Sequence, residues 1–132
     1  MRQLLFALLL FCGLMTNTYA ADPTKIKSVA EWLITNGEVM PKQDVPNLQG
    51  WGHDFNNCPG YPQGISVVFL TNGQVGMFMV MINDGRNIIA TDLGLDGRID
   101  HYNVAQSSQL IPRETVQSIF DELVEFSFIN TR

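Results

Sequence analysis

The chain has 132 residues, of which 45% are hydrophobic and 16% are charged, and its formal net charge at pH 7 is −5. This length is enough for one compact domain with a modest core, and a second domain is not expected. The excess of acidic side chains repels nucleic-acid phosphates and anionic lipid headgroups, so the composition argues against both as partners.

The first 20 residues have the features of a cleavable signal peptide. Arg2 supplies a positive charge, residues 4–15 form an apolar core, and Ala20 completes a small-residue cleavage site before Ala21. The apolar run is shorter than the roughly 20 residues that a membrane span needs. The sequence therefore predicts a signal peptide at 1–20, a single mature α+β domain at 21–132 without a membrane span, and a periplasmic or secreted location.

Cleavage leaves Cys58 as the only cysteine of the mature chain, because Cys12 lies in the signal peptide. An intrachain disulfide is then excluded, although an exported protein meets an oxidising environment. A buried thiol is the simplest interpretation of Cys58. An intermolecular disulfide and a reactive site are the alternatives.

The mature chain is expected to begin with a helix. Asp22-Pro23 combines a capping residue with a proline at the first helical position, and Asn36-Gly37 ends the pattern. Between them, the apolar residues Ile26, Val29 and Leu33 form a stripe at helical spacing.

Residues 38–64 are predicted to form a long irregular loop. Four prolines and four glycines interrupt this segment and disfavour both helix and strand. Loops of this length in a small domain tend to be functional. The aromatic residues Trp51, Phe55 and Tyr61 are therefore candidates for contact with a partner.

A β-hairpin is expected next, with strands at 65–71 and 74–82 around the turn Asn72-Gly73. A two-residue turn would pair Val68 with Met77. Residues on both faces of this hairpin are apolar. Further strands are expected at 87–91 and 99–104, and a last helix is expected from Pro112 onward.

The predicted fold class is therefore α+β: a four-stranded antiparallel meander with an N-terminal and a C-terminal helix packed on one face. The second apolar face needs the 38–64 segment or a partner to cover it, since contiguous exposed apolar patches usually mark interaction sites. The leading prediction is a small, exported, non-enzymatic binding domain with an unidentified ligand. A protein partner or a homodimer would fit it.

The run at 92–103 resembles the calcium loop of EF-hands and dockerins over its twelve residues. Carboxylates recur around a glycine, as calcium requires, and the resemblance implies ligands from Asp92, Asp96 and Asp100 and from the backbone carbonyl of Arg98. Asn103 stands where the bidentate acid is expected. Calcium is therefore the cofactor of the alternative prediction. An ordinary hairpin turn at 96–97, which would pair Asp92 with His101, also explains the run.

Two weaker patterns suggest other chemistry. Met77, Met79 and Met81 alternate on one strand, and together with Trp51 and His53 they resemble the binding set of periplasmic copper chaperones. Cys58 also lies near His53 and Asp54, the residue types of nucleophilic catalysis. Core filling by the methionines and chance clustering of the polar residues are the favoured interpretations.

Overall fold

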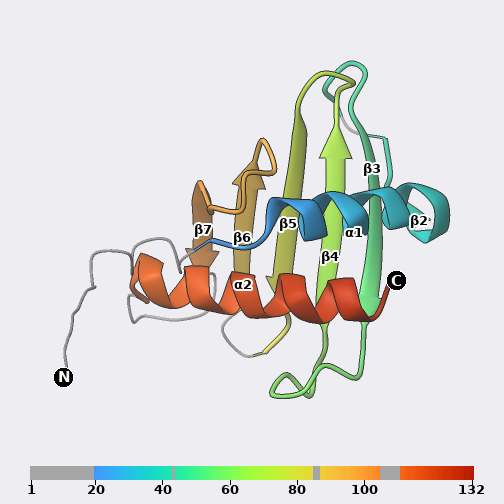
Figure 1. The fold of residues 1–132 in the computed structure, drawn as a ribbon. Coiled ribbons are helices and arrows are strands. Elements are labelled where there is room, and N and C mark those ends of the chain that lie inside the picture. Colours follow the sequence, from blue (N-terminus) through green and yellow to red (C-terminus); the bar gives the residue numbers. More distant parts are fainter. Residues whose placement is uncertain (1–19, 43, 85–86, 105–110) are drawn as a thin grey trace, which may run out of the picture.

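The computed structural model of the protein describes residues 20–42, 44–84, 87–104 and 111–132 (Figure 1). The predicted signal peptide thus lies outside the described residues, except for Ala20. The elements are α1 (Pro23–Asn36), β2 (Glu38–Val39), β3 (Gln49–Phe55), β4 (Ile65–Thr71), β5 (Gly76–Ile82), β6 (Ile88–Leu93), β7 (His101–Val104) and α2 (Arg113–Ile129). Among these described residues, no helix has the length and apolar character needed to cross a membrane.

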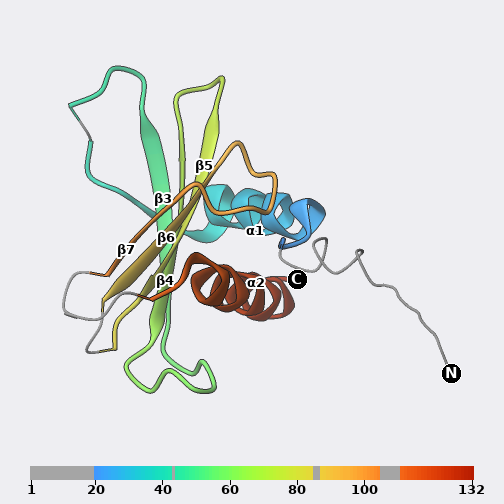
Figure 2. The ribbon, with the colours of Figure 1, turned by 90° about the vertical axis from the view of Figure 1, so that its left-hand side faces the viewer.

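The fold is α+β, with two helices on one antiparallel sheet. The sheet has six strands in the order β2-β3-β4-β5-β6-β7, and each strand pairs antiparallel with its neighbour along the chain. The prediction of four strands was therefore wrong in number. Both helices lie on the same side of the sheet, so the described chain forms two layers (Figure 2).

The two additional strands come from the segment 38–64, which was predicted to be an irregular loop. Gly50 and Gly52 disfavour a strand in an isolated sequence, but on β3 they lie where other groups approach closely. A Cβ atom at Gly50 would lie 2.4 Å from Cδ2 of Leu70, and one at Gly52 would lie 3.2 Å from Sδ of Met40. The glycines therefore allow the Met40 side chain to lie across the strand.

The hairpin between β4 and β5 is present, but its connection is longer than two residues. Thr71 pairs with Gly76, and Val68 pairs with Met79 instead of Met77. The side chain of Asn72 explains the difference, because its Oδ1 accepts hydrogen bonds from the backbone N–H groups of Gln74 and Val75, each at 2.9 Å. A register shift of two residues leaves every side chain on its predicted face.

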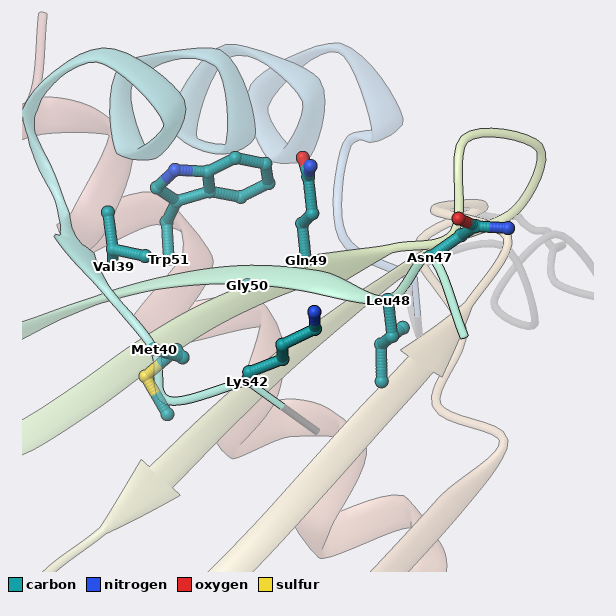
Figure 3. A pocket seen from close by; sticks show the side chains of 8 residues that line it. All are labelled: Val39, Met40, Lys42, Asn47, Leu48, Gln49, Gly50 and Trp51. Carbon is teal, nitrogen blue, oxygen red and sulfur yellow. The ribbon is translucent and has the colours of Figure 1, made fainter. Parts of the chain in front are cut away.

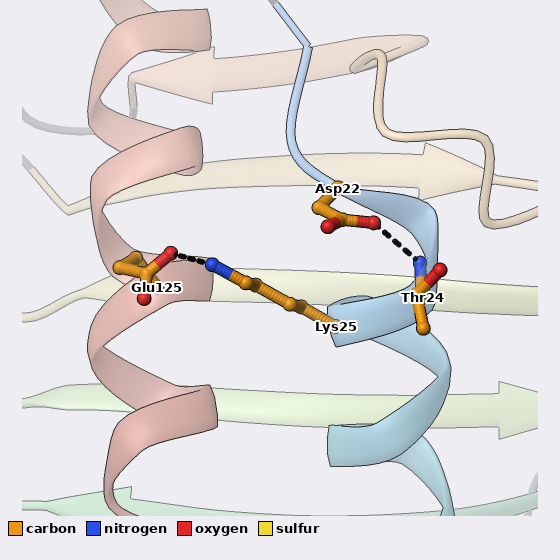
Figure 4. Close-up of polar contacts among 4 residues, drawn as sticks. All are labelled: Asp22, Thr24, Lys25 and Glu125. Carbon is orange, nitrogen blue, oxygen red and sulfur yellow. Dashed lines mark hydrogen bonds and ion pairs between the residues drawn. The ribbon is translucent and has the colours of Figure 1, made fainter.

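The helices are fixed to each other and to the sheet. Asp22 caps α1 by accepting a hydrogen bond from the Thr24 backbone N–H at 2.9 Å, and Lys25 of α1 forms an ion pair with Glu125 of α2 (Figure 4). Beneath them, Phe120 of α2 meets Phe78 of β5 edge to face, with ring centroids 6.2 Å apart. The hydrophobic core therefore lies between the helices and one face of the sheet.

Candidate functional site

The sheet face opposite the helices carries a continuous set of apolar side chains. Alternation along the strands places on this side Val68, Leu70, Met77, Met79, Met81, Ile89 and Leu93, which we call the open sheet face. Val68 is buried by its neighbours, and the others are partly or largely exposed. Leu93, at the end of β6, is 46% exposed.

No helix or strand among the described residues lies over the centre of the open sheet face (Figure 2). Its nearest cover is the side chain of Met40, which crosses the glycines of β3. Lys42 and Leu48 lie on the same side of β3 as Met40 (Figure 3), whereas the later part of the segment, with Cys58 and Tyr61, lies beside α2 on the helix side. An apolar sheet face that the described chain leaves uncovered has the character of an interaction surface.

Two ionisable side chains lie at opposite margins of the open sheet face. Asp54 is on β3 and accepts a hydrogen bond from Oγ of Ser66 at 2.6 Å. His101 is on β7, in register with Thr91. Both side chains are exposed. The open sheet face thus has a carboxylate near one margin, on the same side of β3 as Lys42, and an imidazole near the other.

The aromatic candidates Trp51 and Phe55 do not form an exposed aromatic loop. Both lie on β3 and point to the helix side, where Trp51 stacks on Phe69 with ring centroids 6.2 Å apart and Phe55 meets Phe126 of α2 at 5.4 Å. Tyr61 is half-buried against the core. Their predicted role in binding a partner stays a prediction.

Trp51 also lines an open pocket of about 590 Å³ where the chain departs from β2 and returns to β3. Figure 3 shows Trp51 and Gln49 on one side of the β3 strand, with Met40, Lys42 and Leu48 on the other. The pocket therefore spans both sides of the hairpin, and its lining lacks a cluster of converging polar groups of the kind that orients a small ligand.

The structure separates the residues of the weaker chemical hypotheses. His53 faces the helices, where its ring meets the ring of Trp32 edge to face, with centroids 5.1 Å apart. Asp54 and the methionines Met77, Met79 and Met81 point to the other side of the sheet. Neither a catalytic triad nor a copper set can form from side chains on opposite faces. Burial and the nearby Glu122 carboxylate raise the pKa of the Cys58 thiol, so this buried cysteine is held in its less reactive form.

The acidic loop between β6 and β7 draws its carboxylates together. Oxygen atoms of Asp92, Asp96 and Asp100 lie within 4.8 Å of one another. Asp92 is fully buried and accepts hydrogen bonds from the backbone N–H groups of Gly97 at 2.8 Å and Asp96 at 3.3 Å. The hairpin-turn alternative was wrong in register, because His101 pairs with Thr91 and not with Asp92.

The fourth predicted ligand residue, Arg98, lies exposed on the same loop. Its backbone N–H donates to Oδ1 of Asp96 at 3.0 Å, while the backbone N–H of Leu93 donates to Oδ2 of Asp100 at 2.6 Å. Backbone groups of the loop therefore already engage all three carboxylates. These hydrogen bonds account for the turn of the loop without requiring an ion.

Sequence reasoning missed Gln117, the residue of α2 that clamps the acidic loop. Gln117 is buried, its Nε2 donates to the carbonyl of Gly97 at 2.9 Å, and its Oε1 accepts from the backbone N–H of Ile99 at 2.9 Å. The backbone N–H of Ala21 donates to the same Gly97 carbonyl at 2.9 Å. The sequence around Gln117 does not indicate this role, because the loop residues that it contacts precede it by 18 and 20 residues.

Burial raises the pKa of Asp92 from 3.8 to about 6, with a smaller contribution in the same direction from the neighbouring Asp96, while the N–H groups of the loop oppose the shift. The folded chain therefore binds a proton at Asp92 more tightly than the unfolded chain does. Ionisation of Asp92 therefore lowers the free energy of unfolding, and this loss develops as the pH rises from about 4 to about 6.

We expect the stability of the protein to fall as pH rises from about 4 to about 6, because the raised pKa favours the folded state only while Asp92 is protonated. The contribution of Asp92 should be roughly 1–3 kcal/mol and level off above pH 6. Thermal melts at several pH values measure it. The variant Asp92→Asn, which cannot ionise, should lose this part of the pH dependence; an unchanged profile would assign it to other groups.

Comparison of the chain with protein-family models, curated proteins and solved structures finds no match. The geometry of the open sheet face and of the acidic loop is therefore what supports a function.

Proposed function

We propose that this protein is an exported, non-enzymatic protein-interaction domain, periplasmic or secreted, that binds a partner through the open sheet face. The observation that carries the proposal is a sheet with apolar side chains on both faces and helices over only one of them. Burial of apolar side chains is the main favourable contribution to protein association. A partner over this face would complete a second core.

The methionines support a role in recognition. Met77, Met79 and Met81 form the central row of the open sheet face, on β5. Methionine is unbranched and flexible, so it adapts its shape to an opposing surface and is common where proteins bind apolar partners. Three methionines on a row that faces no other described element fit this use.

Photo-crosslinking in the exporting cells tests the proposal. Benzoylphenylalanine introduced at Met79, in the centre of the open sheet face, should yield a crosslinked adduct with the partner. The matched control is the same amino acid at Ile34, an apolar residue of α1 that is 47% exposed on the opposite layer. Equal labelling at the two positions, or no adduct from position 79, would argue against an interaction through this face.

Calcium binding by the acidic loop is the alternative function, favoured by the convergence of Asp92, Asp96 and Asp100. Calcium takes six to eight oxygen ligands, so backbone carbonyls or water would have to complete the shell. Cleavage after Ala20 would also place a positively charged α-amino group on the Gly97 carbonyl of this loop. The positive charge of that ammonium on the loop would disfavour a nearby cation.

Thermal melting of the mature chain with excess calcium and then with chelator tests the alternative. The chain must begin at Ala21, with a second version extended by two residues to displace the α-ammonium. Calcium at 100 times its dissociation constant should add about 2.7 kcal/mol to the free energy of unfolding. Asp100→Asn should abolish the gain, whereas Asp44→Asn, at an exposed acid outside the loop, should not. An unmoved melting temperature in both versions would reject the site.

A further inference from the structure

We propose that the protein partner of the open sheet face inserts a basic side chain, a lysine or an arginine, into a hollow between Glu38 and Asp54. The inference rests on the proposed function, which requires only that the face bind some protein. It adds the chemistry by which that protein is recognised: a cation on a surface that is otherwise apolar.

The hollow is continuous with the open sheet face and has a volume of about 190 Å³. Val68 and Met81 line it and also belong to the face, while the Met40 side chain, which lies across Gly52, forms another wall. Sites for small molecules usually measure about 300–1,000 Å³. The smaller hollow therefore suits a single side chain of a partner that covers the neighbouring apolar residues.

The polar part of the lining is acidic. Glu38 pairs with Gly52 across β2 and β3, and Asp54 lies two residues further along β3, so both side chains are on the open side of the sheet. Diagonal neighbours of this kind lie about 7–8 Å apart. The Ser66 hydroxyl donates to Oδ1 of Asp54 at 2.6 Å and holds this carboxylate in place. A cation seated between the two acids could contact both.

Neither carboxylate of the hollow has a cationic partner in the described ranges of the chain, where Glu38 and Asp54 form no ion pair. Lys42 lies on the same side of β3 but lines the separate pocket beside Gln49, towards the other end of the strand (Figure 3). The ring of His53 lies on the helix side, against aromatic rings. The acidic charge of the hollow is therefore available to a group from outside.

A basic side chain matches both parts of the lining. Lysine and arginine combine an apolar stem with a charged head. The stem would pack on Val68 and Met81, and the head would meet the two carboxylates. Opposite charges across an interface contribute to specificity and fix the register of the partners. The hollow would thus select one protein among those that present an apolar surface.

Crosslinking from position 79 in charge variants tests the proposal. Glu38→Gln and Asp54→Asn keep the shape of each side chain and remove its charge, so each should lower the adduct yield by about two- to fivefold, and the double variant by more. Asp44→Asn removes an exposed acid of the same segment outside the hollow and should leave the yield unchanged. Added salt should lower the wild-type yield towards that of the double variant.

The attachment point on the partner identifies the inserted residue. Mass spectrometry of the adduct from position 79 should place it beside a lysine or arginine of the partner. Replacement of that residue by methionine keeps an unbranched apolar stem and removes the charge. It should lower the yield as much as the double variant of this chain does, and the two changes together should lower it no further.

The outcomes separate this inference from the proposed function. An unchanged yield in the double variant, or additive losses when the basic residue of the partner is also replaced, overturns the basic side chain and leaves the interaction domain standing. If the wild type gives no adduct from position 79, the proposed function falls as well. Far-ultraviolet circular dichroism confirms that each variant is folded, and the salt dependence of the wild type decides if one is not.

Discussion

Gly97→Ala is expected to destabilise the protein by about 3 kcal/mol, with a fall in Tm of roughly 10–15 °C. Two effects combine at this position. Gly97 has a φ of +95°, where a side chain is strained, and a Cβ atom there would lie 2.0 Å from the carbonyl oxygen of Ala21. The N-terminal segment would have to move away and lose its hydrogen bond to Gly97.

Gly94→Ala is the matched control for this experiment. Gly94 lies in the same loop and has a φ of +92°, but a Cβ atom there would meet nothing within 4 Å. It should therefore cost only the backbone strain, about 1 kcal/mol. The difference between the two variants in denaturant unfolding measures the close approach of Ala21. Equal destabilisation would show that Ala21 does not pack against the loop in solution.

Gln117→Ala is expected to destabilise the protein by about 2–4 kcal/mol, since it removes both hydrogen bonds that Gln117 makes with the acidic loop. The Ile99 backbone N–H would lose its acceptor while buried, and an unsatisfied buried donor costs about 1–3 kcal/mol. The Gly97 carbonyl would keep only the bond from Ala21. Hydrogen exchange should show loss of protection at the Ile99 amide together with the fall in stability.

Two further variants separate this role from a general effect on α2. Ser118→Ala changes the adjacent, exposed residue and should leave stability within about 0.5 kcal/mol of the wild type. Gln117→Glu retains an acceptor for Ile99 but, when ionised, has no donor for Gly97 and faces Asp121 at hydrogen-bond distance. It should be destabilised at neutral pH and partly recover under acid conditions. Full stability of Gln117→Ala would contradict the clamp.

The helices and the central hairpin could be predicted because their signals are local. The cap at Asp22 and the apolar stripe at Ile26, Val29 and Leu33 predict α1 from consecutive residues, and all three apolar residues are buried. Alternation at 65–82 likewise predicts which side chains share a face. A helix or strand with one apolar face carries that pattern whatever packs against it.

Strand β3 could not be predicted in the same way, although part of its signal is present. Trp51, His53 and Phe55 alternate, but the glycines Gly50 and Gly52 flank Trp51, and glycines usually interrupt a strand. Only the approach of Met40 and Leu70 explains why glycine is suitable there. A contact among residues from three separate segments leaves no pattern in any one of them.

For the candidate site, the sequence by itself determined the acidic loop, the methionine row and the apolar character of both sheet faces. The tertiary structure decided that both helices lie on one face, that the 38–64 segment leaves the centre of the other face open, and that Gln117 and Ala21 hold the acidic loop. The physical reason is the range of the interactions. Hydrophobic periodicity acts over neighbouring residues, whereas coverage of a face and satisfaction of a buried loop depend on groups that only folding brings together.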